Sequence, residues 1–139
     1  MEIKRIDERI SVSPQIDVED VARLKAAGFV AIINNRPDGE DPTQPPGAAV
    51  ANAAAAAGLR YFAIPLGRDG VRDELIEATR QALDSVDGPV LAYCRSGTRS
   101  TTLWALSRAG HDAADDIVAK AAGAGYEISH LRGHLNAGA

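Results

Sequence analysis

The sequence predicts an α/β domain in which helices cover both faces of a mainly parallel sheet of about four to five strands. Short apolar runs typical of strands alternate with longer segments whose apolar residues recur at helical spacing. The most apolar runs are continuous, which indicates strands that are buried on both faces, as in a parallel sheet. A chain of 139 residues fits one domain, which we expect to span residues 1–139.

The first predicted strand is short and lies at residues 9–12, where polar and apolar residues alternate. A helix is expected next, because Asp17 can cap its first turn and the apolar residues from Val18 onward recur at helical spacing. Gly28 is placed to end this helix, since glycine tolerates the left-handed conformation of a helix terminus. Residues 29–33 are then continuously apolar, which predicts a strand covered on both faces.

A long loop separates this strand from the next helix. Residues 34–46 contain four prolines, and a loop of this length is often functional. Residues 48–57 predict an alanine-rich helix that is closed by Gly58. The next strand is expected at residues 61–64, because Pro65 follows it and cannot continue a ladder of hydrogen bonds.

The second half of the chain repeats the same pattern of strands and helices. Residues 73–86 have one apolar face at helical spacing, which predicts a helix. Residues 90–93 then form an apolar run, which predicts a strand that ends directly before Cys94. Three further helices are expected at residues 100–109, 112–122 and 126–135. Units that alternate in this way build parallel sheets through right-handed crossovers.

The composition argues against several classes of partner. The net charge of −4 disfavours nucleic acid, which requires a basic face. No apolar run is long enough to span a membrane. Residues 1–5 lack the apolar core of a signal peptide and Cys94 is the only cysteine, so we expect a cytoplasmic protein. No residues have the spacing of a complete metal site, and we expect neither a metal nor a cofactor.

The stretch VLAYCRSGTRS, residues 90–100, predicts a strand, an anion-binding loop and a helix start. The first amides of a helix have no intrahelical partner and carry partial positive charge, so they stabilise a thiolate held against them. Arg95 and Arg99 add positive charge near Cys94. We therefore expect Cys94 to be an activated nucleophile, although a lone cysteine at a strand end is more often a buried apolar residue.

The residues after Cys94 are suited to cradle an anion. Small or permissive turn residues allow successive backbone amides to point inward and form an anion-binding nest. Arg99 can add a planar fork of donors that matches two oxygens of a tetrahedral anion, and Ser100 could donate a hydrogen bond to the sulfur. The residues expected to line the anion-binding loop are Arg95, Ser96, Gly97 and Thr98.

Loops after the other strands should meet this loop, because ligands gather beyond the carboxyl ends of parallel strands. Each of these loops carries an arginine: Arg36 after the second strand and Arg68 after the third. Arg36 could hold substrate or hydrogen-bond loop carbonyls, and a structural role is equally favoured. Asn34 is expected to tie the loops together. The arginines form a local patch suited to a small anion.

The residues from Tyr93 to Ser100 resemble the active-site loop of rhodanese-type sulfurtransferases, in which four residues separate the cysteine from the arginine. The tyrosine-phosphatase loop has five. The stretches at residues 32–38 and 61–66 are instead similar to the dual-specificity tyrosine-phosphatase fold. The combination resembles a bacterial phosphatase-like family that is fused in some bacteria to a beta-lactamase-like persulfide dioxygenase and is also labelled a sulfur transferase.

Two enzymatic activities follow from this resemblance, and sulfur transfer is favoured. The shorter loop has one fewer amide, which fits a sulfur atom on Cys94 better than a phosphoryl group. Tyr93 also stands where phosphatases usually have a histidine. The expected partners are a small anionic sulfur donor, such as thiosulfate or a persulfide, and an external thiol acceptor, because the chain has no second cysteine.

The alternative activity is hydrolysis of a phosphoester through a phosphocysteine. Asp69 lies near the position that the resemblance implies for the general acid, although a role as a helix cap or in an Asx turn is favoured about two to one. Asp38 is a weaker candidate for the acid. A third possibility is a module that binds an anion or records oxidation of Cys94 without turnover.

Overall fold

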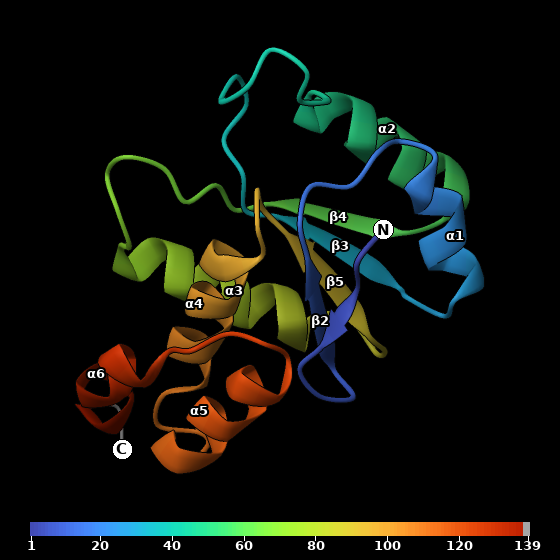
Figure 1. Ribbon diagram of the computed structural model, residues 1–139. Coiled ribbons are helices and arrows are strands. Elements are labelled where there is room, and N and C mark those ends of the chain that lie inside the picture. The colour runs from blue at the N-terminus through green and yellow to red at the C-terminus, as the bar shows by residue number, and fades with distance from the viewer. Residues whose placement is uncertain (138–139) are drawn as a thin grey trace.

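The computed structural model describes residues 1–137 and contains a five-stranded sheet in the order β1-β2-β5-β3-β4 (Figure 1). The strands are β1 (Lys4–Arg5), β2 (Ile10–Ser13), β3 (Ala31–Asn34), β4 (Arg60–Ala63) and β5 (Val90–Tyr93). β1 pairs antiparallel with β2, and every other pairing is parallel. The predicted α/β fold with a mainly parallel sheet is confirmed.

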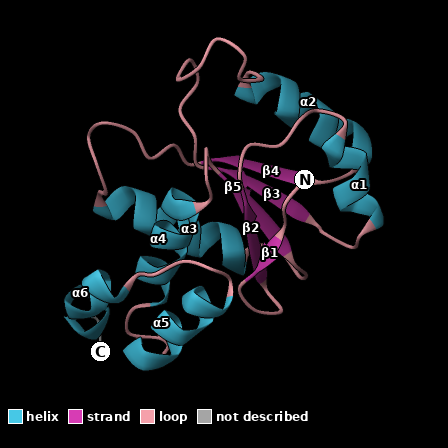
Figure 2. Cartoon of the chain, viewed as in Figure 1, coloured by secondary structure: helices cyan, strands magenta, loops and turns pink. Residues whose placement is uncertain are grey.

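Helices cover both faces of the sheet, as Figure 2 shows. Their bounds are α1 (Asp20–Ala26), α2 (Gly47–Ala57), α3 (Asp73–Asp84), α4 (Thr98–Arg108), α5 (Ala114–Gly123) and α6 (Arg132–Ala137), with a short 3₁₀ turn, η1, at Ser129–Leu131. α1 and α2 lie on one face, and α3 to α6 lie on the other. None of the helices within residues 1–137 is long and apolar enough to cross a membrane.

The central strand β5 contributes to a core on each face of the sheet. Val90 and Ala92 belong to the larger core, and Leu91 and Tyr93 belong to the smaller core beneath α1 and α2. All four residues are buried, because successive side chains of a strand point to opposite faces and both faces are covered. The continuous apolar run at residues 90–93 therefore correctly predicts a strand that is buried on both faces.

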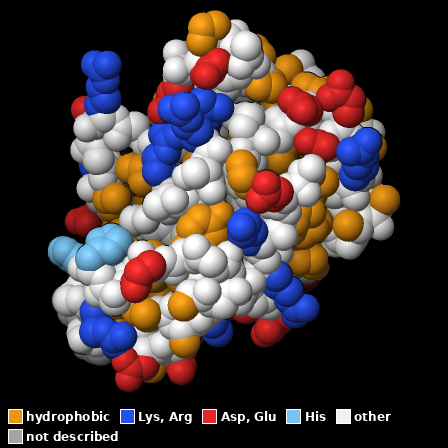
Figure 3. All heavy atoms as spheres, in the orientation of Figure 1, with side chains coloured by type: hydrophobic (Ala, Val, Ile, Leu, Met, Phe, Trp, Pro, Cys, Tyr) orange, Lys and Arg blue, Asp and Glu red, His pale blue; other side chains and the backbone are white. Residues whose placement is uncertain are grey.

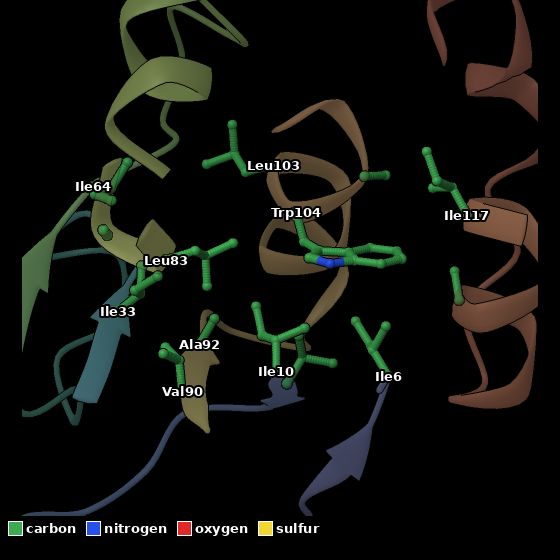
Figure 4. Packing of buried hydrophobic residues seen from close by; sticks show 14 of the residues in the cluster. Ile6, Ile10, Ile33, Ile64, Leu83, Val90, Ala92, Leu103, Trp104 and Ile117 are labelled. Atoms are coloured by element: carbon green, nitrogen blue, oxygen red, sulfur yellow. The ribbon is translucent and has the colours of Figure 1, made fainter. Parts of the chain in front are cut away.

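The larger core is organised around Trp104 of α4, which is 2% exposed. Its indole lies over Ile6, which follows β1, and over Ile10 of β2, and it faces Ile117 of α5 (Figure 4). Burial of one large aromatic ring against two layers fixes α4 on the sheet. The start of α4, which follows the cysteine loop, is positioned by this packing.

Two features at the N-terminal end differ from the expected elements. α1 begins at Asp20 rather than directly after Asp17, and the Asp20 carboxylate accepts a hydrogen bond from the Asp17 amide at 2.8 Å. Val18 consequently lies in a turn outside the helix and is 40% exposed. β1, which has only two residues, is not predicted because it is too short to show a period.

Candidate functional site

The site lies at the carboxyl edge of the sheet, where the chain leaves β5. The Cys94 amide donates a hydrogen bond to the Ser13 carbonyl of β2 at 3.4 Å, and the Asn35 amide donates to the Tyr93 carbonyl at 2.8 Å. Cys94 is thus held between the ends of the two strands that flank β5. Its side chain is fully buried. This is the edge at which the sequence places the site.

The sulfur of Cys94 accepts a hydrogen bond from the backbone of its own loop. The Gly97 amide donates to Cys94 Sγ over 3.0 Å, and Gly97 is also the N-cap residue of α4. Gly97 has a φ of 93°, a left-handed conformation that turns its amide back toward the sulfur. The sulfur thus lies against a backbone N–H at a helix start, and the role of Cys94 as a nucleophile stays a prediction.

A tyrosine from the C-terminal part of the chain supports this loop. The Tyr126 hydroxyl donates a hydrogen bond to the Ser96 carbonyl at 2.9 Å. A Cβ atom added to Gly97 would overlap the Tyr126 hydroxyl. Burial, together with the nearby charge of Cys94, raises the pKa of the Tyr126 phenol. Neither period nor motif marks Tyr126 in the sequence, because its role depends on contact with a loop 30 residues away.

Arg99 is held by the loops that follow β3 and β4. Its two terminal nitrogens each donate to a different Glu40 carboxylate oxygen at 2.8 Å, and Nη1 also donates to the Leu66 carbonyl at 2.9 Å. The hydrogen bonds from Arg99 lower the pKa of Glu40 to about 2. The fork of donors that the sequence assigns to an anion is therefore occupied by a carboxylate of the same chain.

Arg36 has a structural place beside this ion pair. It is 5% exposed, and its guanidinium donates to Glu40 Oε1 at 3.0 Å and to Gln15 Oε1 at 3.1 Å. Arg36 was expected either to act on substrate and loop carbonyls or to have a structural role. Its bonds to the side chains of Glu40 and Gln15 support the structural role. Glu40 is absent from the sequence-based site, and the four-residue spacing from Arg36 is the only local signal that could have found it.

Asn34 and Asn35, at the end of β3, hold this part of the chain to β4 and to the loop that follows β4. Asn34 Nδ2 donates to the Tyr61 hydroxyl at 2.9 Å, and the Arg36 amide donates to Asn34 Oδ1 at the same distance. Asn35 Nδ2 donates to the Ile64 carbonyl at 2.8 Å. Asn35 therefore ties the two loops together, which is the role expected of Asn34, whereas Asn34 bonds to a side chain of β4 and within its own loop.

Two expected interactions of the cysteine loop take another form. Ser100 Oγ is buried without a hydrogen-bond partner among residues 1–137, so the bond expected from Ser100 to the sulfur is not formed and the Gly97 amide is the donor. Thr98 directs its amide to Ser96 Oγ at 3.4 Å, and Ser96 Oγ donates to Thr98 Oγ1 at 3.1 Å. The Thr98 amide, which was expected to face an anion, therefore bonds to the side chain of Ser96.

A cleft of about 600 Å³ opens where the loops meet, and arginines and carboxylates line it. The cationic lining comes from Arg68, Arg95 and Arg99. Asp38 and Glu40 supply the carboxylates, and Asp38 Oδ1 accepts a hydrogen bond from the Gly47 amide at 2.8 Å. The sequence-predicted arginines of the three loops therefore meet in space, apart from the buried Arg36.

Asp69 does not line the cleft but follows Gly67 and Arg68, which do. It lies in an exposed turn that is closed by a hydrogen bond from the Gly70 amide to the Gly67 carbonyl at 3.1 Å. It does not cap α3, because that helix begins after Arg72 and has no side-chain cap. The cap considered for Asp69 is therefore wrong, and its role as an acid stays a prediction.

Within residues 1–137 no group of three or more His, Cys, Asp or Glu side chains could hold a metal ion.

Comparison with solved structures agrees with this architecture. A phosphatase-like protein from Neisseria meningitidis is 33% identical, with a TM-score of 0.83 over 100% of this chain and 99% of that one. TpbA from P. aeruginosa, solved with phosphotyrosine, is 18% identical, with a TM-score of 0.63 over 97% of this chain and 80% of that one. The second likeness shows the fold alone, which is that of cysteine-phosphatase-like proteins.

Comparison of sequences identifies the family. The beta-lactamase hydrolase-like protein of Agrobacterium fabrum is 41% identical over 109 residues, which are 78% of this chain. The match covers 25% of that protein, so this chain corresponds to about a quarter of its length. The family model for the phosphatase-like domain of beta-lactamase hydrolase-like proteins matches residues 2–113. The chain therefore belongs to the family of phosphatase-like domains found in beta-lactamase hydrolase-like proteins.

Proposed function

We propose that this protein hydrolyses phosphate monoesters through a phosphocysteine on Cys94. The observation that carries the proposal is the 3.0 Å hydrogen bond from the Gly97 amide to Cys94 Sγ at the start of α4. This contact fixes the position of the sulfur that must attack phosphorus. The fold shared with cysteine-phosphatase-like proteins supports phosphate rather than sulfane sulfur as the group transferred.

The first step forms an S–P bond between the Cys94 thiolate and the substrate, and breaks the P–O bond to the leaving alcohol. A carboxylic acid gives its proton to the departing oxygen, and we assign this role to Asp69 because its neighbours Gly67 and Arg68 line the cleft. In the second step the Asp69 carboxylate takes a proton from water, whose oxygen attacks phosphorus. The S–P bond breaks, and inorganic phosphate and the Cys94 thiolate are released.

The environment of Arg99 bears on substrate binding. Its guanidinium is bonded to Glu40 and to the Leu66 carbonyl, so a phosphate that uses the same fork must replace the carboxylate. A phosphate dianion offers more negative charge than a carboxylate and the same paired oxygens, and can make this exchange. We place the reaction in the cytoplasm, where a free thiol stays reduced.

Sulfur transfer is the second candidate, and one observation favours it: only four residues separate Cys94 from Arg99. In this reaction the thiolate attacks the outer sulfur of a donor such as thiosulfate. The S–S bond of the donor breaks, sulfite leaves, and an external thiolate later removes the sulfur from the Cys94 persulfide. The phosphatase-like fold supports sulfur transfer less than it supports phosphate hydrolysis.

The test compares both substrates on the same protein. We would measure phosphate release from an aryl phosphate, and record intact-mass spectra after incubation with thiosulfate. We expect phosphate release that disappears in Cys94→Ser, and no stable persulfide. A persulfide adduct with no phosphate release would overturn the proposal in favour of sulfur transfer.

A second comparison tests the acid. Asp69→Asn should lower the rate with an alkyl phosphate, whose poor leaving group needs a proton, by about 10²-fold or more. Asp87→Asn changes the same charge in an exposed turn before β5, at the opposite edge of the sheet, and should have no effect. Equal rates for both variants would remove Asp69 from the mechanism without affecting the role of Cys94.

A further inference from the structure

We infer that Arg68 and Arg95 form a second anion subsite in the cleft, and that the substrate is a small organic molecule carrying a second phosphate group. The inference rests on the proposed phosphatase function and specifies its substrate class. It starts from the three arginines, Arg68, Arg95 and Arg99, that line one cleft from different loops. Only one of the three is needed beside the reacting phosphate.

The pairing of charges leaves two of these arginines available. Glu40 accepts from Arg99 and Arg36, and its carboxylate is thereby neutralised. Arg68 and Arg95 are both exposed, and the ion pairs found within residues 1–137 include neither of them. Three arginines thus face the two carboxylates of Asp38 and Glu40, so the cleft lining carries one net positive charge although the protein as a whole has a net charge of −4.

The space-filling view places this charge at the loops of the site. Lys and Arg side chains gather beside the junction of β5 and α4, and another basic side chain stands over the loop that leads to α3 (Figure 3). The basic groups thus border the cleft from more than one loop. Positive charge collected at one concave site raises the local concentration of an anionic substrate.

The size of the cleft favours a small molecule with two anionic groups. Its volume of about 600 Å³ lies within the range of roughly 300–1,000 Å³ that is typical of small-molecule sites, and exceeds the space that one phosphate needs. Arginine forks bind phosphate oxygens in pairs, so Arg68 and Arg95 suit a phosphate better than a hydroxyl or an apolar group. The acidic remainder of the surface disfavours an extended nucleic acid.

The test uses alkanediol phosphates, which differ only in the number and separation of their phosphates. We would measure kcat/KM for the monophosphates and bisphosphates of ethanediol, butanediol and hexanediol. For at least one length we expect the bisphosphate to be preferred by about tenfold at low salt. Added salt should reduce this preference, because exposed charges are screened.

Variants assign the preference to the two arginines. Arg68→Gln and Arg95→Gln should each lower the ratio of bisphosphate to monophosphate kcat/KM by about three- to tenfold. Arg60→Gln, an exposed arginine on the edge strand β4, removes the same charge elsewhere and should leave the ratio unchanged. A preference that persists in both cleft variants, or no preference at any length, would overturn the inference.

Measuring the binding of these compounds tests the second anion subsite independently of the proposed phosphatase activity. Cys94→Ser protein can be titrated with the same compounds by calorimetry, which requires no turnover. Tighter binding of a bisphosphate that depends on Arg68 and Arg95 would support the subsite even if no phosphate were released. Cys94-dependent hydrolysis without a bisphosphate preference would support the proposed function and refute the subsite.

Discussion

Replacement of Glu40 by glutamine tests the ion pairs that hold the site together. The change keeps the size of the side chain and removes the charge that bridges Arg99 and Arg36. The pKa of Glu40 falls from 4.5 to about 2 in the folded protein, chiefly through hydrogen bonds from Arg99. The charged carboxylate therefore stabilises the folded state, and the glutamine variant should unfold more easily at neutral pH.

The size of this effect follows from the pKa. A shift of this extent corresponds to about 3 kcal/mol at about 1.4 kcal/mol per pKa unit. The Glu40 side chain is 30% exposed, and screening by solvent lowers our expectation to about 1–2 kcal/mol. Because the folded pKa is depressed, the full contribution is present above pH 4.5 and is lost as the pH falls toward 2.

The assay is urea unfolding of the wild type and Glu40→Gln at pH 7, 5, 4 and 3. We expect a difference in the free energy of unfolding of about 1–2 kcal/mol at pH 7 and pH 5, falling to less than half by pH 3. Glu74→Gln is the matched control, because Glu74 forms a more exposed pair with Arg72 and should change stability by at most about 0.5 kcal/mol. A Glu40 effect that equals the control, or grows at low pH, would refute the reasoning.

Three other substitutions test the loop and its support. Gly97→Ala should abolish Cys94-dependent activity, because alanine is strained at a φ of 93° and its Cβ would overlap the Tyr126 hydroxyl. Near-UV circular dichroism would show whether the rest of the fold is intact. Ser100→Ala should leave the melting temperature within about 2 °C, since the hydroxyl has no partner within residues 1–137, and a fall in kcat would then show that this oxygen acts during turnover. Trp104→Ala should cost about 3–5 kcal/mol in chemical unfolding, because the 2% exposed indole fills the larger core; a loss below 1 kcal/mol would contradict that packing.

Local patterns in the sequence account for most of the fold. Gly58 ends α2 in the left-handed conformation with φ of 80°, as its place after the alanine-rich run predicts. Most strand and helix ends lie within two residues of the expected positions, and β5 matches them at both ends. The last predicted helix, residues 126–135, is wrong at its start, because η1 occupies Ser129–Leu131 and α6 begins only at Arg132. α1 also begins later than expected, because the turn from Asp17 to Asp20 takes up residues that the period alone assigns to a helix.

The chemistry of the cysteine loop was also readable from neighbouring residues. A strand that ends at Tyr93 and small residues after Cys94 are local features that predict the loop. The helix begins at Thr98, two residues before the expected start, and the Gly97 amide rather than Ser100 donates to the sulfur. The resemblance added the phosphatase-like body, which the family match confirms. The preference for sulfur transfer came from the loop length and from Tyr93 in place of a histidine, and the comparisons support the phosphatase alternative better.

The sequence by itself determined the α/β fold and the edge of the sheet where the cysteine loop lies, and it singled out Cys94 as the proposed nucleophile, because short-range periodicity and turn chemistry encode these features. Only the tertiary structure decided which groups surround that nucleophile. Glu40 meets Arg99 across 59 residues, and Tyr126 meets Ser96 across 30. Such contacts leave no periodic trace in the chain, since they exist only after the sheet has brought the ends of its strands together.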